Sequence, residues 1–203
     1  MSKDVLMIFI RNPELGKVKT RLAKTIGDHA ALSIYELLLQ HTFEVTKQLR
    51  CDKIVYHAEA IKEIVLRGPD YQKKVQKGSD LGMRMHNAFK AAFEARYQKV
   101  VIIGSDNYDI KATHIEDAFK MMDTNDIVIG PAEDGGYYLL GMKALHPAIF
   151  KEKAWGTATV FAETLKDLKG VSIHLLETLN DIDTYEDAVH IRTFQKFLNH
   201  NNT

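Results

Sequence analysis

Four cationic residues follow the apolar run at the start of the chain and lie close together in sequence: Arg11, Lys17, Lys19 and Arg21. Gly16 lies among them, and a helix is expected to begin near Lys19. Lysine and arginine side chains, together with the free N–H groups at a helix start, supply the charge and the donors that a polyphosphate requires. The segment therefore favours phosphate binding, although neither the Walker A pattern nor G-x-G-x-x-G is present. The structural alternative is a solvated helix start with scattered basic residues.

An acid follows the central apolar run KVVIIG, where Asp106 comes directly after a glycine and a serine. A carboxylate at the mouth of a buried strand, opposite a phosphate-binding loop, is a natural ligand for Mg²⁺. The competing explanation is structural, since Ser105, Asp106 or Asp109 can equally cap a turn or the next helix.

A second acidic segment, NDIDTYEDA, lies near the end of the chain. Thr184 is a possible N-cap, and Glu186 and Asp187 fit the first turn of a helix. That structural explanation covers Asp181 and Asp183 less well, because both precede the helix. If this loop folds back beside the first acid, a second metal carboxylate becomes available.

The segment PAEDGGYYLLG pairs two acids with two glycines: Glu133, Asp134, Gly135 and Gly136. Adjacent glycines allow a tight turn, positive φ and a close approach of the backbone to a ligand. The segment is thus predicted to be either a binding loop or a plain β-turn that leads into an aromatic strand.

Alternating strands and helices must position these loops. The predicted strands are Val5–Ile10, Lys53–His57, Lys99–Gly104, Asp126–Gly130, Tyr137–Gly141 and Val171–Glu177, and the predicted helices are Asp28–Leu49, Leu81–Tyr97, His114–Met122, Thr159–Leu168 and Tyr185–Leu198. The alternation indicates an α/β fold with a mostly parallel sheet and helices on both faces. No linker or repeat interrupts it, so residues 1–203 are predicted to form one domain. Ligands of such sheets bind beyond the carboxyl ends of the strands, where these loops lie.

The overall composition of the chain narrows the class of protein to which it can belong. The chain has 203 residues with 27 Lys plus Arg and 27 Asp plus Glu, so no overall positive charge favours nucleic acid as a partner. A lone cysteine, Cys51, excludes an internal disulfide. The short apolar run near the N-terminus does not suit a signal peptide, and no stretch approaches the roughly 20 apolar residues of a membrane span. The protein is therefore predicted to be cytoplasmic.

Taken in order, these loops resemble the bacterial GT-A-fold transferases grouped as nucleotide-diphospho-sugar transferases or glycosyltransferase-like proteins. That family is related to the guanylyltransferase that activates phospholactate in coenzyme F420 synthesis. The matching pieces are R-N-P-x-x-G-K-V-K-T-R-L-A, G-S-D, G-P-A-E-D-G-G-Y-Y-L-L-G, W-G-T and D-I-D-T-x-E-D, which together span nearly the whole chain. The resemblance implies a three-layer nucleotidyltransferase-like fold with a seven-stranded mixed sheet, in which the strand Tyr137–Gly141 runs antiparallel.

The resemblance also assigns roles to residues. It implies catalytic roles for Lys19, Arg21, Asp106 and Asp134, a metal site at Asp106 and Asp183, and substrate contacts from Arg11, Gly16, Lys17, Lys19, Arg21, Glu133, Gly135 and Gly136. Two positions depart from the family pattern. Asn107-Tyr108 replaces the usual x-Pro after the aspartate, which removes a rigid turn, and Ser79 replaces a glycine before the third helix.

The sequence therefore predicts a transferase that uses Mg²⁺ or Mn²⁺ and acts on a nucleotide-activated substrate. Two chemistries fit: nucleotidyl transfer from a nucleoside triphosphate, and glycosyl transfer from a sugar nucleotide to a small-molecule acceptor, with Glu133 or Asp134 as the base. The alternative from another class is a non-catalytic regulatory protein that binds nucleotides. The base, the acceptor and the oligomeric state stay open at this level.

Overall fold

The computed structural model describes residues 3–61 and 71–198 of the chain. In this part of the chain seven strands form one sheet in the order β3-β2-β1-β4-β6-β5-β7. The strands are β1 (Asp4–Ile10), β2 (Asp52–His57), β3 (Tyr71–Val75), β4 (Lys99–Ile103), β5 (Ile127–Pro131), β6 (Tyr137–Met142) and β7 (Ile173–Leu175). Every neighbouring pair is parallel except the two pairs that include β6.

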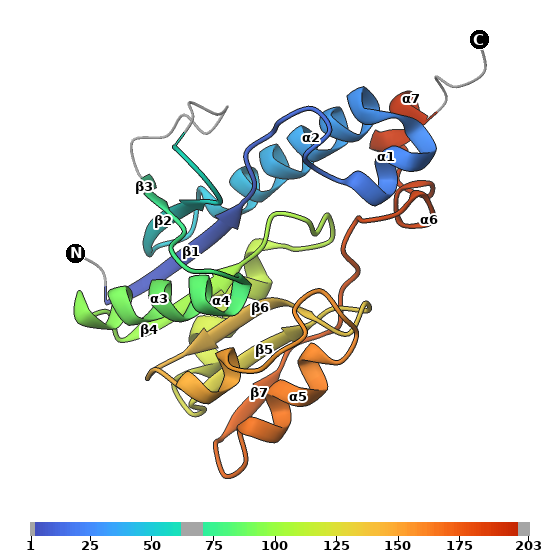
Figure 1. Cartoon of the computed structure of the whole chain (residues 1–203). Coiled ribbons are helices and arrows are strands. Elements are labelled where there is room, and N and C mark those ends of the chain that lie inside the picture. Colours follow the sequence, from blue (N-terminus) through green and yellow to red (C-terminus); the bar gives the residue numbers. More distant parts are fainter. Residues whose placement is uncertain (1–2, 62–70, 199–203) are drawn as a thin grey trace.

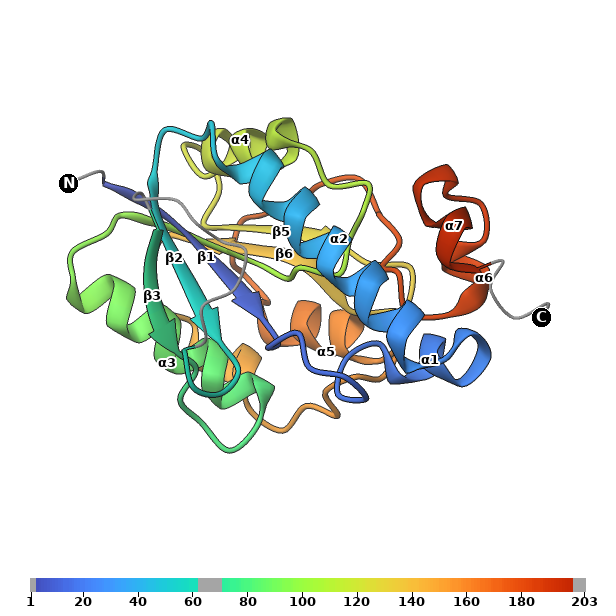
Figure 2. The same cartoon turned by 90° about the horizontal axis from the view of Figure 1, so that it is seen from above.

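Helices cover both faces of this sheet (Figures 1 and 2). The helical segments are α1 (Thr20–Ile26), α2 (Asp28–Thr46), α3 (Leu81–Glu94), α4 (Ala112–Met121), η1 (Pro147–Phe150), α5 (Val160–Asp167), α6 (Tyr185–Ala188), η2 (Arg192–Phe194) and α7 (Gln195–Leu198). Figure 2 shows α2 and α4 on one face of the sheet and α3 and α5 on the other. None of the helices within the described ranges combines the length and apolar character needed to cross a membrane.

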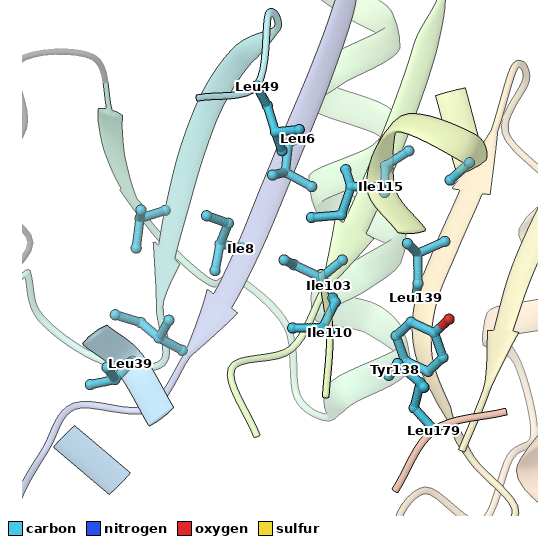
Figure 3. Packing of buried hydrophobic residues seen from close by; sticks show 14 of the residues in the cluster. Leu6, Ile8, Leu39, Leu49, Ile103, Ile110, Ile115, Tyr138, Leu139 and Leu179 are labelled. Carbon is cyan, nitrogen blue, oxygen red and sulfur yellow. The ribbon is translucent and has the colours of Figure 1, made fainter. Parts of the chain in front are cut away.

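The central strands are apolar on both faces because each face is covered by helices. On one face, Leu6 and Ile8 of β1 and Ile103 of β4 pack with Leu39 of α2 and Ile115 of α4 (Figure 3). On the other face, alternate residues of the same strands pack against α3, η1 and α5, with Phe89 and Phe150 at the centre. These two cores fix the carboxyl ends of β1 and β4 beside each other.

A third apolar cluster lies beyond the carboxyl end of β1. There α1, α2, α6 and α7 pack together through Leu22, Ile34, Ile182, Phe194 and other buried residues. Figures 1 and 2 show these helices gathered at one end of the sheet. The cluster joins the first cationic loop to the acidic segment near the end of the chain.

The predicted fold class is confirmed, including the antiparallel strand after the double glycine. One strand was missed: β3, with the sequence YQKKV, is an edge strand whose partly exposed residues give no apolar run. The prediction of one helix over Tyr185–Leu198 was wrong. The β-branched residues Val189, Ile191 and Thr193 disfavour a continuous helix, and the Gln195 side chain bonds the Val189 carbonyl, so the segment divides into α6, η2 and α7.

Candidate active site

A cleft of about 580 Å³ opens at the carboxyl ends of β1 and β4. The segments after these strands form its central wall, beginning with Arg11 and with Gly104. The loop before β6 and the start of α3 complete the cleft. This is the edge at which parallel α/β sheets bind ligands, and it is where the sequence predicted the chemistry to lie.

Lys19 lies at the centre of the charged residues behind this cleft. Its Nζ is 2.6 Å from Asp106 Oδ1 and 2.9 Å from Asp183 Oδ1, and its side chain is only 4% exposed. Lys19 is also the N-cap of α1 and has the left-handed φ of 47°, which is uncommon for a residue with a side chain. Burial alone lowers the pKa of Lys19, but the two carboxylates outweigh burial and raise that pKa above its ordinary value.

The loop that carries Asp106 is tied to the acidic segment near the end of the chain. The Ile182 amide donates to the Asp106 carbonyl at 2.9 Å, and Asn107 forms an antiparallel bridge with Asp181. Asp181 lines the cleft. Burial, and next the charge of Asp106, raise the pKa of Asp181 to about 7. Asp106, Asp181 and Asp183 therefore lie in the same region as the buried Lys19 ammonium.

Tyr35 of α2 holds the first loop against the Asp106 loop. Its buried hydroxyl donates to the Arg11 carbonyl at 3.0 Å, accepts from the Arg11 amide at 2.9 Å and lies 3.2 Å from Ser105 Oγ. Burial, and next the negative charge of Asp106, raise the pKa of Tyr35 to about 12. The hydroxyl therefore keeps its proton at neutral pH and holds both loops as a neutral group.

The predicted cationic residues separate in space. Arg11 and Lys17 line the cleft, and the Lys17 ammonium lies 2.7 Å from Glu14. Arg21 is exposed on α1 and does not line the cleft. The Lys19 side chain is buried behind the cleft wall, where its ammonium contacts the Asp106 carboxylate. Gly16 adopts the left-handed φ of 72° that the loop turn requires. The structure thus brings two of the four cations to the cleft surface.

The double-glycine loop forms a tight turn before β6. Asp134 Oδ1 accepts from the Gly136 amide at 2.8 Å, and Asp134 and Gly136 both line the cleft. Gly135 has a φ of 86°, and a Cβ there would collide with the backbone of Ala158. Glu133 is exposed outside the cleft lining, and its amide donates to the Leu179 carbonyl at 3.1 Å.

Several lining residues were not among the predicted site residues: Gln76, Arg84, Tyr137, Trp155, Thr157 and Asp181. Trp155 packs partly in the core below α3, against Gly82, where any side chain on the helix would collide with the indole ring. It therefore serves both as core and as cleft wall. The W-G-T motif was a sequence signal for Trp155. The signal for Asp181 was its position before a helix, which helix capping does not explain well.

The carboxylates fit a hard divalent cation. A cation already lies against two of them, since the Lys19 ammonium contacts Asp106 and Asp183. Burial is the main cause of the raised pKa of Asp181, and the negative charge of Asp106 adds to it. Within residues 3–61 and 71–198, no three Asp, Glu, His or Cys side chains form a ready-made metal cage. Mg²⁺ typically uses one or two protein carboxylates, with water and substrate phosphates as its other ligands.

The comparisons with known proteins place the chain in a family. Residues 39–157 match the family DUF2064, described as "Uncharacterized protein conserved in bacteria", and the chain belongs to this family. A solved structure of a candidate nucleotide-diphospho-sugar transferase from Desulfovibrio desulfuricans G20 is 32% identical, with a TM-score of 0.88 over 96% of this chain and 89% of that one.

Two further proteins are similar to this chain, one in sequence and one in fold. The 2-phospho-L-lactate guanylyltransferase of Methanocaldococcus sp. (strain FS406-22) is 24% identical over 95% of this chain and 88% of that protein. The manganese complex of Rv0371C from Mycobacterium tuberculosis H37Rv is 15% identical, with a TM-score of 0.52 over 90% of this chain and 95% of that chain, and so shows likeness of fold alone. The predicted class, a nucleotide-dependent transferase, is confirmed by the similarity to the guanylyltransferase and to the candidate nucleotide-diphospho-sugar transferase.

Proposed function

We propose that this protein is a nucleotidyltransferase that uses a divalent metal and a nucleoside triphosphate to activate a small acceptor. The observation that carries the proposal is the contact of Asp106 and Asp183 with the Lys19 ammonium, at a cleft that Asp106, Asp181, Arg11 and Lys17 line. This pairing of carboxylates with cationic groups suits a metal–polyphosphate substrate. The similarity to a guanylyltransferase supports the same reading.

In this reaction an oxygen of the acceptor attacks the α-phosphorus of the triphosphate. The bond between the α-phosphorus and its bridging oxygen breaks, and pyrophosphate leaves with the electron pair. Arg11 and Lys17 lie where they can offset the charge of the phosphates, and the Tyr35 hydroxyl holds the Arg11 backbone in place. Catalysis then depends on positioning and on electrostatic stabilisation of the leaving group.

Asp106 and Asp181, whose carboxylates line the cleft, would hold the metal, and the metal role predicted for Asp183 stays a prediction. When bound, the cation supplies charge neutralisation and orientation of the phosphate oxygens. Lys19 supports the carboxylates from inside the protein, where its Nζ keeps Asp106 and Asp183 together. The sequence prediction that Lys19 and Arg21 contact phosphate directly stays a prediction. In this structure neither residue lines the cleft.

Glycosyl transfer from a sugar nucleotide is a second candidate. It is favoured by Asp134, an exposed carboxylate on the cleft wall that could accept a proton from an acceptor hydroxyl. The likeness to a candidate nucleotide-diphospho-sugar transferase supports it as well. A phosphate acceptor would need no such base, so the role of Asp134 separates the two chemistries.

The test is a thermal-shift panel of the purified chain with GTP, CTP, ATP, UTP and common sugar nucleotides, each with and without Mg²⁺ or Mn²⁺. A ligand present at about 100 times its Kd adds about 2.7 kcal/mol of stability. We expect a metal-dependent shift with one triphosphate. A shift confined to a sugar nucleotide would overturn nucleotidyl transfer in favour of glycosyl transfer, and no shift with any nucleotide would reject both.

Two variants give this test its specificity. Asp106→Asn should fold like the native chain and lose the metal-dependent part of the shift. Asp109→Asn is the matched control, because Asp109 is exposed on the same loop and does not line the cleft. Equal loss in both variants would attribute the effect to the loop and not to the Asp106 carboxylate.

A further inference from the structure

Asn107 is buried, with 4% exposure, between the two acidic loops of the site. Its Nδ2 donates to the Asn180 carbonyl at 3.0 Å and to Asp181 Oδ1 at 3.2 Å. Its Oδ1 accepts from the amides of Asp109 at 3.0 Å and Ile110 at 2.9 Å. One carboxamide thus makes four hydrogen bonds, two with its own loop and two with the other acidic loop.

The oxygen and the nitrogen of this carboxamide bond to different loops. The oxygen closes the turn after Asp106, as asparagine side chains commonly do when they accept from backbone amides. The nitrogen reaches across to the other loop and orients the Asp181 carboxylate. A hydrogen bond to a charged group is stronger than one between neutral groups, so the Nδ2 donor fixes which way the crowded carboxylate faces.

The backbone reinforces the same junction. Asn107 and Asp181 form an isolated antiparallel bridge, and the Ile182 amide donates to the Asp106 carbonyl at 2.9 Å. Asp106 and Asp183 meet at Lys19 on one side of this junction. Asn107 is the side chain that holds the junction together on the side of Asp181.

We propose that Asn107 is a positioning residue, whose Nδ2 donor sets the Asp181 carboxylate for binding a divalent cation with Asp106. This inference rests on the proposed function. It also gives a role to the residue just before Tyr108, which stands where the resembling family has a proline. The rigid turn that a proline would supply is replaced by a side chain that closes the turn and reaches the second loop.

The experiment uses the full chain at pH 8 with Mn²⁺ alone as the probe, measured by the paramagnetic resonance signal of free Mn²⁺. Asn107→Asp keeps an acceptor for the turn, loses the donor and adds a negative charge. Asn107→Ser loses the same donor without adding charge. Asn125→Asp is the matched control, since Asn125 lies on the loop before β5 and outside the cleft lining.

Loss of a residue that orients a metal ligand typically weakens metal binding about 10–100-fold. We expect a weakening in this range for both variants at Asn107 and none for the control. Native affinity in both variants would overturn the proposal. Tighter binding by Asn107→Asp alone would also overturn it, because local charge and not the donor would then decide the affinity.

Hydrogen exchange supplies a readout that needs no metal. In Asn107→Asp the Ile182 amide should exchange about 10-fold faster or more, because its loop is released, while the Asp109 and Ile110 amides stay protected by the remaining acceptor. Loss of protection at all three amides would reduce Asn107 to a structural role in the turn and reject the proposal.

The two proposals fail in distinguishable ways. If the native chain leaves the free Mn²⁺ signal unchanged, the metal assignment falls and the role of Asn107 falls with it. If the native chain binds Mn²⁺, and Asp106→Asn abolishes the binding while both variants at Asn107 preserve it, only the positioning role is lost.

Discussion

Lys19 and Asp106 form an ion pair with one buried and one accessible partner. The Nζ–Oδ1 distance is 2.6 Å, and the lysine side chain is 4% exposed while the aspartate side chain is 45% exposed. The cation therefore neutralises the carboxylate from inside the protein and leaves it open to the cleft. The same lysine serves Asp183, whose side chain is 42% exposed.

Lys19→Met tests this internal counter-ion. The substitution keeps the length of the side chain and removes the charge, so Asp106 and Asp183 repel each other without compensation. We expect a loss of about 1–3 kcal/mol in the free energy of unfolding, less than for a fully buried pair because solvent screens the carboxylates. Urea denaturation measures it, with Lys24→Met on the exposed face of α1 as the control. Equal stability of the two variants would contradict the role of Lys19.

Asp181→Asn tests the effect of pH on the metal-free protein. The pKa of Asp181 is raised to about 7 from the ordinary value of 3.8, so the folded state holds a proton that the unfolded state releases near pH 4. The unfolded state binds fewer protons across this window, and stability from this group therefore falls as pH rises from about 4 to 7. The groups that act on its carboxyl are Asp106 and Asp134, which raise the pKa, and Asn107 and Lys19, which lower it.

The measurement is urea unfolding at several pH values with a chelator present. The native chain should lose stability relative to Asp181→Asn between pH 4 and 7, and the difference should level off above pH 7. A difference that stays constant with pH would show that Asp181 is ionised throughout. Added Mg²⁺ should narrow the difference at pH 8, because a bound cation stabilises the ionised carboxylate.

The sequence located the loops well, because each follows a strand that is strongly apolar. Their residue types also identified Asp106 and the double glycine as parts of one edge of the sheet. The sequence could not show which of the cationic side chains line the cleft. Arg11, Lys17 and Lys19 have similar chemistry, and only the tertiary structure shows that the Lys19 ammonium is buried against Asp106.

The distinction between Asp181 and Asp183 also required the tertiary structure. Their spacing in DID is the same in any fold. In this structure Asp181 forms a bridge with Asn107 and lines the cleft, whereas Asp183 pairs with Lys19.

Strand β3 was also not predicted from the sequence. Its lysine-rich sequence suits an exposed edge, which polar residues protect from pairing with other chains.

Tyr35→Phe tests the link between the first loop and the Asp106 loop. The change removes a hydroxyl that both donates to and accepts from the Arg11 backbone and leaves those groups without a partner. We expect a cost of about 1–3 kcal/mol and weaker nucleotide binding, because Arg11 loses its fixed position. Calorimetric titration measures the binding.

Tyr97→Phe is the matched control for this change. The Tyr97 hydroxyl donates to Asp52 Oδ2 at 2.8 Å near the start of β2, away from the cleft. Its loss should cost about 0.5–1.5 kcal/mol and leave nucleotide affinity unchanged. Unchanged affinity in Tyr35→Phe as well would show that the Arg11 loop keeps its shape without the hydroxyl.

Gly135→Ala tests the turn that presents Asp134 to the cleft. Gly135 combines a φ of 86° with close packing on the Ala158 backbone, and its carbonyl accepts from the Phe161 amide at 2.9 Å. Gly170 has a similar φ of 81° with nothing near its Cβ position, so Gly170→Ala isolates the backbone effect. That effect should be about 1–2 kcal/mol, and crowding should make Gly135→Ala roughly 1–3 kcal/mol worse. Urea unfolding of both variants measures the difference, and equal destabilisation would show that the contact with Ala158 relaxes freely.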